Sequence, residues 1–490
     1  MIPHDLMAPL MFGALVLFML VGYPVAFSLA AVGLSFAFIA VQSGFFEVSL
    51  LQALPERVFG IMANDLLLAI PFFTFMGAVL ERCGLAEDLL EGMGQLFGPM
   101  RGGLAYAVII VGAILGAITG TVAASVIAMG LISLPVMMRY GYDMRLATGV
   151  IAASGTITQL IPPSLVLVVL ADQLGRSVGD MYAGAIGPSI VQVLLFCAYV
   201  LVLSIVKPKA MPALPREALT LHGWALYSRI LWGMVPSLVL IFLVLGTILM
   251  GLATPTEGGA MGAVGAIILA ALHRRLTWDL LWQGMESTMR ITAMVIFILI
   301  GSTVFSLVFR GVDGDTWIEH LLTSLPGGAV GFLIFVNIFV FFLAFFLDFF
   351  EIAFIIIPLL APVATKLGID LIWFGVLLGA NMQTSFMHPP FGFALFYLRG
   401  IAPKEVKSSD IYWGAIPWVF LQLMLVAILV FWPGLVTSFL DQDKSIDINK
   451  VRIEVPVDET PNMEDKGGAS EQDDAQKAFD RAQGQSEPAK

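Results

Sequence analysis

Residues 154–164 read SGTITQLIPPS, and residues 381–391 read NMQTSFMHPPF. Each stretch lies inside an apolar segment and contains a double proline near its end. Proline lacks an amide hydrogen and clashes with the carbonyl one turn earlier, so two prolines in a row leave several carbonyls without helical partners. The two stretches therefore predict two membrane helices that are broken at the same relative position.

The correspondence between the two stretches extends along the chain at a constant offset of 227 residues. It pairs Gly84 with Gly311, Pro99 with Pro326, Pro135 with Pro362, Gly141 with Gly368 and Asp143 with Asp370. Proline, glycine and aspartate are unfavourable inside helices, so their coincidence predicts that helix ends recur at matching places. A membrane protein built from two broken-helix units typically moves a solute, with its site where the breaks meet.

The composition is that of a polytopic membrane protein. The chain has 490 residues, of which 59% are hydrophobic and 12% are charged, and its mean hydropathy is +0.92. A span needs about 20 apolar residues, so the chain has room for roughly ten crossings. Cys83 and Cys197 are far apart in apolar surroundings, which favours neither a disulfide framework nor a metal cluster.

The apolar segments predict two repeats, each with a re-entrant helical hairpin and a broken helix. The first repeat is expected at 1–206, with its hairpin at about 102–139 and its broken helix at about 144–172; a linker follows at 207–229; the second repeat is expected at 230–440, with its hairpin at about 329–366 and its broken helix at about 370–399. The amphipathic piece expected at 277–290 is followed by a separate span at 291–309. Residues 441–490 hold 13 acidic and 7 basic residues, which predicts a disordered acidic tail.

Lysine and arginine predict the orientation, because they accumulate on the cytoplasmic side of membrane proteins. Basic residues flank the open end of the first hairpin, fill the linker, and recur at 273–275 and 399–407. If all of these basic residues face the cytoplasm, the linker is cytoplasmic and successive helices cross the membrane in alternating directions. The second hairpin then enters from the opposite face, so the repeats are inverted copies, and both termini are expected outside.

Each hairpin has a polar tip, Thr119-Gly120-Thr121 in the first and Asp348 in the second. Two ordinary spans joined by a tight turn are the alternative. Asp348 is flanked by Phe345, Phe346, Phe349 and Phe350, a setting too apolar for a surface loop. Irregular backbone at membrane depth is tolerated where protein or water surrounds it, so we favour re-entrant hairpins.

The broken segments supply neutral oxygen atoms. A hard alkali cation is well matched by such oxygens. They are the hydroxyls of Ser154, Thr156 and Thr158, the amide oxygen of Asn381 and the freed backbone carbonyls. The alternative is a kink whose hydroxyls bond back to their own helix. Half-helices that start after the breaks direct partial positive charge inward, which favours an anion such as an organic acid. Outside the breaks, Thr254 or Thr256 is expected to cap a helix that carries Glu257 in its first turn. Asp348 is expected either to ligate a cation or to cap the return helix.

Several motifs in order resemble one known family. They are Gly116 to Ala124 (GAITGTVAA), Gln159 to Ser164 (QLIPPS), Ala253 to Glu257 (ATPTE), Leu347-Asp348, and His388 to Tyr397 (HPPFGFALFY). Over about residues 1–440 the chain resembles the large membrane (M) subunit, DctM-like, of tripartite ATP-independent periplasmic (TRAP) transporters.

The resemblance implies an all-α, inverted-repeat, elevator-type secondary transporter in the bacterial inner membrane. It also implies sodium (Na+) as the driving ion and an organic acid anion as the substrate. The implied partners are a small membrane subunit of about four helices and a periplasmic substrate-binding protein, with the lipid bilayer as surroundings and no nucleic acid.

Carried over by position, the resemblance assigns two sodium sites and an anion site. The first sodium site is expected at Thr119, Gly120, Thr121, Ser154 and Gly155, and the second at Asp348, Asn381, Thr384 and Met387. The anion is expected at Thr121, Ser125, Thr156, Pro163, Ser164, Thr384 and Pro390. The chain departs from the family pattern at Thr158 and in the bulky group Phe386, Met387 and His388, which affects the exact ligands and the size of the substrate.

Three other functions remain as alternatives. One is a symporter without partner subunits, the second is a channel-like anion pore, and the third is a membrane enzyme that uses Asp348 and His388. The sequence contains no GxxxxGK[ST], HExxH or serine-elbow motif, so we expect no enzymatic activity and no catalytic residues. The energy for transport is then expected from an ion gradient.

Overall fold

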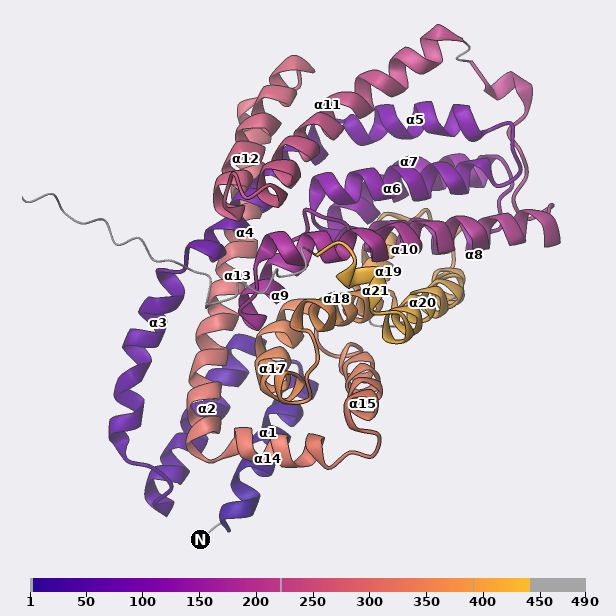
Figure 1. Ribbon diagram of the computed structural model, residues 1–490. Coiled ribbons are helices and arrows are strands. Elements are labelled where there is room, and N and C mark those ends of the chain that lie inside the picture. The colour runs from indigo at the N-terminus through magenta and orange to yellow at the C-terminus, as the bar shows by residue number, and fades with distance from the viewer. Residues whose placement is uncertain (1–2, 221–222, 391, 441–490) are drawn as a thin grey trace, which may run out of the picture. The chain divides into compact units, whose positions relative to one another are not determined.

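The computed structural model describes residues 3–220, 223–390 and 392–440, and within these ranges the regular structure is entirely helical (Figure 1). Eight of the described helices are long and apolar enough to cross a membrane, or up to ten if two bent pairs each count as one span. The prediction of an all-α polytopic membrane protein is confirmed. The expected tail at 441–490 lies outside the described residues.

The helices of the first half follow the expected order. They are α1 (His4–Val21), α2 (Val25–Ser43), η1 (Val48–Ala53), α3 (Leu54–Met62), α4 (Asp65–Arg82), α5 (Leu85–Phe97), α6 (Gly103–Thr119), α7 (Val122–Arg139), α8 (Met144–Thr156), η2 (Ile157–Gln159), α9 (Leu165–Leu174) and α10 (Val178–Val206). The short helix η3 (Arg216–Ala218) lies in the linker.

The second half repeats this order with local changes. Its helices are α11 (Trp224–Leu249), α12 (Pro255–Leu272), α13 (Trp278–Gly311), α14 (Gly314–Thr323), α15 (Gly328–Leu343), α16 (Phe349–Glu351), the π-helical turn η4 (Ile352–Ile356), α17 (Ile357–Lys366), α18 (Leu371–Met382), η5 (Gln383–Met387), α19 (Phe393–Ile401), α20 (Ser408–Phe431) and α21 (Gly434–Thr437).

Helix ends coincide at the offset of 227 residues because the same local signals set them. The broken helix of each half begins after an aspartate that caps it: the Asp143 carboxylate accepts from the amides of Arg145 and Leu146, and the Asp370 carboxylate accepts from the amide of Trp373. An N-cap carboxylate satisfies amides that have no helical partner. The repeated residues therefore produce repeated elements.

The prediction of two pieces at 277–290 and 291–309 is wrong, because α13 is one continuous helix of 34 residues. In the first half, the side chain of Asn64 caps α4, and the segment Val48–Met62 is bent by 46° against it. In the second half the equivalent position is Ile291, which cannot cap a helix. The Arg290 guanidinium bonds instead to Glu286 one turn earlier, at 2.7 Å, so the helix continues.

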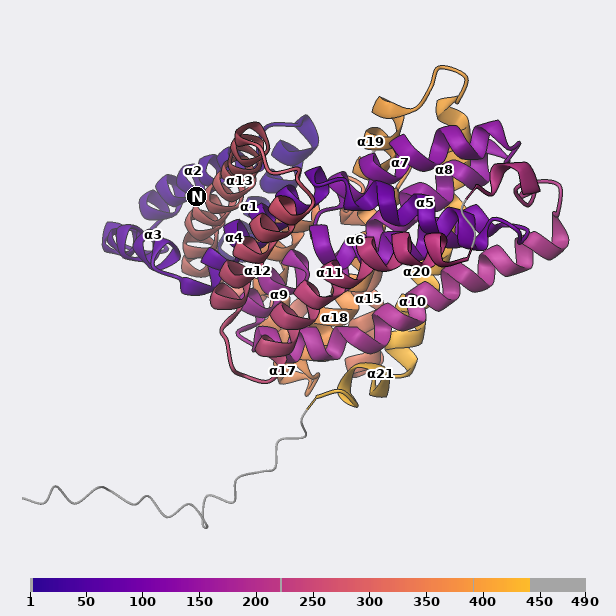
Figure 2. The same cartoon turned by 90° about the horizontal axis from the view of Figure 1, so that it is seen from above.

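Two names are used below for sets of helices within the compact unit of residues 1–440. We use "framework group" for α2, α4, α11, α12 and α13, and "inner group" for the two hairpins, the two broken helices, α10 and α20. In the framework group, α2 and α13 run side by side (Figures 1 and 2). A Cβ atom built on Gly301 of α13 would lie 2.4 Å from the carbonyl oxygen of Ala26 in α2, so these helices are in backbone contact. In the inner group, α20 packs along α8, and α10 packs on α9 and α18.

Candidate functional site

The first break lies between α8 and α9. After Thr156 the chain makes one 3-10 turn and then runs through Pro162 and Pro163 to Ser164. The Ser164 hydroxyl donates to the carbonyl of Gln159 at 2.5 Å and accepts from the amide of Val166 at 3.2 Å. Ser164 thus closes the break and starts α9 with a buried cap.

The hydroxyls of the first break bond back to their own helix. Ser154 donates to the carbonyl of Ile151, Thr156 to that of Ala153, and Thr158 to that of Gly155, each at 2.9 Å. This is the alternative considered from the sequence. A hydroxyl that has donated its one hydrogen still carries lone pairs. The break is therefore lined with oxygen atoms that can accept or ligate but cannot donate.

The tip of the first hairpin lies against this break. α6 ends at Thr119, and Gly120 takes a left-handed conformation (φ 60°) that leads into α7. A Cβ atom on Gly120 would lie 3.9 Å from Cγ of Leu165, the first residue of α9. The hydroxyls of Thr119 and Ser125 lie 2.9 Å apart. The fold therefore brings the predicted tip residues and the predicted break residues together.

Glycines let the helices approach at backbone distance. On the inner side, a Cβ atom on Gly112 of α6 would lie 2.7 Å from Cβ of Ser154, and one on Gly155 of α8 would lie 2.2 Å from Cγ2 of Val126 in α7. On the framework side, a Cβ atom on Gly77 of α4 would lie 2.2 Å from the carbonyl oxygen of Thr119. No side chain beyond hydrogen fits at these positions without displacement of the neighbour.

The second break is bound to the first arm of the second hairpin. α18 ends at Met382, and η5 and the double proline follow. The Asn381 amide donates to the backbone carbonyl and the side-chain oxygen of Asn337, at 2.8 and 3.0 Å. Asn337 lies in the middle of α15. The ring of His388 packs on the rings of Phe341 and Phe345, with centroid distances of 4.5 and 4.0 Å.

Three buried oxygen atoms at the second break have no hydrogen-bond partner within the described part of the chain. They are Oδ1 of Asn381, Oγ1 of Thr384 and Oγ of Ser385. Each residue is at most 5% exposed. Buried polar atoms are nearly always satisfied in proteins, so this group of oxygens calls for a further partner, such as water or an ion.

Asp348 caps the return helix of the second hairpin. Its carboxylate accepts from the amide of Glu351 at 3.0 Å, and its own amide donates to the Glu351 carboxylate at 2.9 Å. A carboxylate offers about four lone-pair positions, so this cap does not use up the oxygens of Asp348. The turn that follows, η4, is π-helical, and Ser302 of α13 donates to its Phe354 carbonyl at 2.6 Å. Such turns occur frequently at functional sites.

The two broken helices cross each other. A Cβ atom on Gly375 of α18 would lie 2.7 Å from Cδ1 of Leu174 in α9, and one on Gly379 would lie 3.3 Å from Cδ1 of Leu170. α8 also packs against η5. The predicted residues of the first half lie on elements that contact one another: Thr119, Gly120, Thr121, Ser125, Ser154, Gly155, Thr156, Pro163 and Ser164. In the second half, Asn381, Thr384, Met387 and Pro390 lie at the break, whereas Asp348 lies at the hairpin tip, where α16 packs on α9 and α13.

Sequence reasoning missed three polar residues that touch the breaks. They are Asn337, Gln192 in α10 and Gln422 in α20, which bond to Asn381, Gln383 and Thr156, respectively. The available signal was that each is a lone amide in an apolar helix, which marks a functional candidate in a membrane protein.

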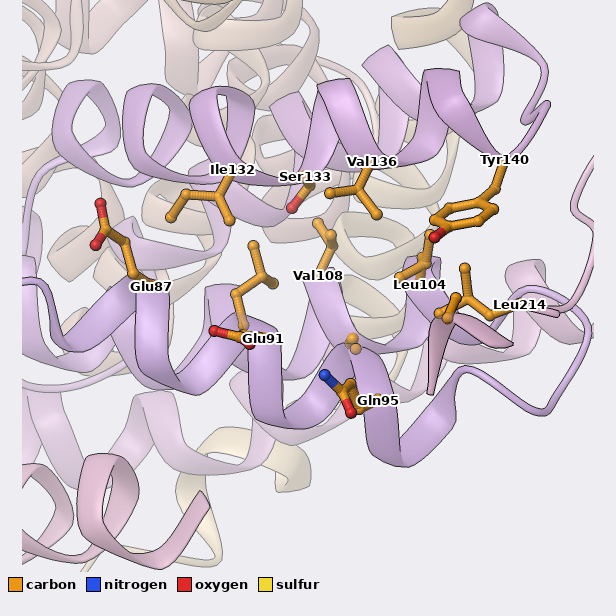
Figure 3. Close-up of a pocket in the computed structure, with 14 residues that line it drawn as sticks. Glu87, Glu91, Gln95, Leu104, Val108, Ile132, Ser133, Val136, Tyr140 and Leu214 are labelled. Carbon is orange, nitrogen blue, oxygen red and sulfur yellow. The ribbon is translucent and has the colours of Figure 1, made fainter. Parts of the chain in front are cut away.

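A cavity of about 420 Å³ between α5, α6 and α7 contains none of the predicted site residues (Figure 3). Val108, Ile132 and Val136 form much of its wall, and the carboxylates of Glu87 and Glu91 lie along α5 (Figure 3). The carboxylates of Glu87 and Glu91 would repel an anion bound in this cavity. This cavity is therefore unsuited to an organic acid.

A second cavity, of about 350 Å³, is lined by two arginines from distant parts of the sequence. Arg57 of α3 and Arg310 of α13 line it together with Ser302, Thr303 and Ser306. Nε of Arg310 also pairs with Asp315 at 3.1 Å. Asp172 of α9 is in the lining too, and both of its oxygens accept from the amides of Asn64 and Gln173, at 2.8 and 2.9 Å. Guanidinium groups beside hydroxyls are suited to a carboxylate.

Comparisons with known proteins agree with each other. The family model "Tripartite ATP-independent periplasmic transporter, DctM component" matches residues 12–435. The C4-dicarboxylate TRAP transporter large permease protein DctM of Pseudomonas aeruginosa is 30% identical over 391 residues, which are 79% of this chain and 89% of that protein. Its namesake in Rhodobacter capsulatus is 28% identical, over 87% of this chain and 97% of that protein.

Two further matches are a longer relative, of which only part is matched, and a solved structure. The isethionate TRAP transporter permease protein DctMQ of Oleidesulfovibrio alaskensis is 28% identical, over 88% of this chain but only 66% of that protein. The crystal structure of the YdaH transporter of Alcanivorax borkumensis matches with a TM-score of 0.54 at 16% identity, and covers 79% of this chain and 88% of that one. At this identity the structural match indicates a shared fold.

Proposed function

The chain belongs to the DctM component family of tripartite ATP-independent periplasmic transporters, and on that basis we propose that it transports an organic acid anion by symport with sodium. In this proposal it is the transport subunit in the bacterial inner membrane. A periplasmic substrate-binding protein delivers the anion, and a small membrane subunit joins the framework group.

The main support for sodium is the set of unpaired acceptors at the second break, Asn381, Thr384 and Ser385. Neutral oxygens and freed carbonyls at a broken helix are the usual ligands of a transported sodium ion. Asp348 would add a negative charge at the hairpin tip. Among the described residues, no three His, Cys, Asp or Glu side chains gather as they would around a transition metal. The donor set therefore fits an alkali cation.

The first break would hold the other cation with its hydroxyl and carbonyl oxygens. Ser154 and Gly155 lie beside the hairpin that carries Thr119, Gly120 and Thr121. Each cation that moves inward through a potential of 100 mV releases about 2.3 kcal/mol. Two cations per cycle would support strong accumulation of an anion.

The proposal of an anionic substrate draws on the helix starts and on the relatives. The N-termini of α9 and α19 follow the double prolines and direct amides and partial positive charge towards the breaks. The relatives are named for C4-dicarboxylates, isethionate, 2,3-diketo-L-gulonate and sialic acid. All of these are anions at neutral pH, and they differ in size, so the anionic group is their shared chemistry.

The proposal of a separate small subunit draws on the relative named DctMQ. About a third of that protein has no counterpart in this chain, which leaves room for a fused membrane segment there and for a separate subunit here. A sliding motion, in which the inner group would move across the framework group as one unit, is part of this proposal.

Uptake into sealed proteoliposomes tests the proposed function. The genes beside that of the chain are searched for a small membrane subunit and a secreted binding protein. The chain is reconstituted with their products, and labelled C4-dicarboxylate, isethionate and sialic acid are offered in turn. We expect saturable uptake of one of them that requires an inward sodium gradient and the binding protein. Uptake with sodium but without the binding protein would favour the standalone symporter instead.

Two other outcomes contradict the proposal. Uptake that neither saturates nor depends on sodium would indicate an anion pore. Chemical conversion of the probe in sealed vesicles without any gradient would indicate an enzyme. Potassium in place of sodium, at equal ionic strength and membrane potential, is the control for the driving ion.

A further inference from the structure

Two buried glutamines connect each helix break to the other half of the chain. Gln192 lies in α10 of the first half and contacts Gln383 in the second break, and Gln422 lies in α20 of the second half and contacts Thr156 in the first break. Both glutamines are 0% exposed. Thr156 and Gln383 are equivalent positions, because the offset of 227 residues carries one onto the other.

At the second break the two amides form a closed pair. Nε2 of Gln192 donates to Oε1 of Gln383 at 2.7 Å, and Nε2 of Gln383 donates back to Oε1 of Gln192 at 3.3 Å. Each side chain therefore satisfies one donor and one acceptor of the other. Gln383 is the first residue of η5, so the pair fixes the point where α18 stops being α-helical.

At the first break the hydrogen-bond direction follows from the threonine. Thr156 donates its single hydroxyl hydrogen to the carbonyl of Ala153 at 2.9 Å, so it can only accept from Gln422, whose Nε2 lies 2.8 Å away. Thr156 is the last residue of α8. Gln422 thus bonds to the last residue of α8, on the N-terminal side of the first break. Its own Oε1 remains a buried acceptor without a partner among the described residues.

The two glutamines are not themselves equivalent. The offset carries Gln192 onto Val419, and Gln422 lies three residues further along α20. Residues three apart lie on the same face of a helix. The same contact is thus made in both halves from the same face of the long helix, although a different residue of that helix supplies it. Simple duplication of one glutamine does not explain this.

The contacts also run crosswise. Gln192 lies in α10, which follows the first broken helix, but bonds to the second break, and Gln422 lies in α20, which follows the second broken helix, but bonds to the first. Within its own half, α10 also bonds to the first break, through the Ser189 hydroxyl and the carbonyl of Leu160 at 3.0 Å. A buried amide that loses its partner is left unsatisfied, so each contact is costly to open. The start of each break is therefore joined to the long helix of the other half by one side-chain contact.

We propose that Gln192 and Gln422 are positioning residues that hold the oxygens of the opposite break in the geometry needed for the transported cation. The inference rests on the proposed sodium symport. In this assignment Thr156 and Gln383 are anchor points, and the oxygens that contact the ion belong to their neighbours.

Paired substitutions test the proposal without leaving a buried amide unsatisfied. Gln192→Leu is combined with Gln383→Leu, and Gln422→Leu with Thr156→Val. The first readout is hydrogen–deuterium exchange of the full chain in lipid nanodiscs. We expect faster exchange at 380–388 only in the first pair and at 153–160 only in the second, because each contact holds one break.

The second readout is sodium activation of uptake in proteoliposomes. We expect the half-saturating sodium concentration to rise about fivefold in either pair, which corresponds to about 1 kcal/mol, the typical value of one buried hydrogen bond. Ser237→Ala is the matched control, because Ser237 is a fully buried hydroxyl in α11 that bonds only to its own helix, at the carbonyl of Gly233. We expect this control to leave both readouts unchanged.

Exchange that rises equally at both breaks, or not at all, overturns the proposal. It is also overturned if the melting temperature falls while the half-saturating sodium concentration stays constant, because the glutamines would then only join helices. If the unsubstituted protein shows no sodium-dependent uptake, the proposed function fails instead, and the crosswise exchange pattern alone decides whether the two glutamines hold the breaks.

Discussion

At the scale of single residues, two helix starts share one geometry and differ in their surroundings. Thr254, one of the two caps that the sequence allows, forms a capping box with Glu257 at the start of α12, and Asp348 and Glu351 form another at the start of α16. Thr254 is exposed and Asp348 is half-buried. A half-buried carboxylate is less well hydrated than an exposed one, so a cation at the hairpin tip would stabilise Asp348 beyond its role as a cap.

The substitution Asp348→Ser separates the two roles of this residue. Serine caps a helix about as well as aspartate does, so we expect the melting temperature to change little. The negative charge is lost, however, and we expect the half-saturating sodium concentration for uptake to rise at least tenfold, about 1.4 kcal/mol. Both quantities are measured on the same preparation.

Thr254→Ala provides the matched control for a cap without a proposed ligand role. We expect it to cost about 1 kcal/mol of stability and to leave sodium activation unchanged. If Asp348→Ser behaves like Thr254→Ala in both measurements, Asp348 is a cap and nothing more.

The residues beside the breaks could be predicted from the sequence because their signals are local. Pro162 and Pro163 mark a break wherever they occur in an apolar helix, and Gly120 marks a turn. Asn337, Gln192 and Gln422 stand out in the sequence only as lone amides in apolar helices, which does not say what they contact. Their partners lie in distant segments, and only the packing of α10, α15 and α20 decides which break each amide faces.

At the scale of elements, the first hairpin and the first broken helix depend on small residues at their crossing. A Cβ atom on Gly112 would lie 2.7 Å from Cβ of Ser154 and 3.0 Å from its carbonyl oxygen. We expect Gly112→Ala to cost about 1–3 kcal/mol, the usual cost of overpacking, and to reduce uptake because the crossing must open. Thermal unfolding in detergent and uptake per folded protein check this prediction.

Gly13 in α1 is the matched control for this glycine, because a Cβ atom there meets nothing within 4 Å. We expect Gly13→Ala to leave uptake unchanged and stability unchanged or slightly higher, since alanine favours helices. Equal losses in the two variants would contradict the packing explanation and indicate a general sensitivity to glycine replacement.

Local signals also decided which elements were predictable. Asp143 and Asp370 fixed the starts of the broken helices, and the sequence contains both. The continuity of α13 was missed because an amphipathic stretch suggested a boundary, whereas no capping residue stands at Ile291. The π-helical turn η4 was also missed, because it is fixed in part by Ser302 on a different helix.

At the scale of the whole molecule, the cavity lined by Arg57 and Arg310 joins helices of both halves. Two guanidinium groups near a polar cavity would raise the local concentration of an anion, an effect that weakens with salt. We expect Arg57→Gln to raise the half-saturating concentration of the anion about fivefold, about 1 kcal/mol, and to leave the maximal rate little changed. The salt dependence of uptake should fall in parallel.

Arg290→Gln is the matched control, because Arg290 is an exposed arginine on α13 that pairs with Glu286 and does not line this cavity. An equal effect of both substitutions would mean that overall charge matters and the cavity does not. The sequence could not have paired Arg57 with Arg310, since neither lies in a motif and only the packing of α3 against α13 brings them to one cavity.

Gly77 of α4 touches the main chain of the first hairpin at Thr119, which has a consequence for inhibition. In the proposed sliding motion, neither surface has a side chain there that must be lifted over the other, so resistance to travel at this point is low. Steric bulk would therefore arrest the cycle more effectively than charge. A small wedge-shaped compound, or a bulky residue at position 77, would press on the main chain of Thr119 at the hairpin tip and so act as a brake at the point where the framework meets the first proposed ion site.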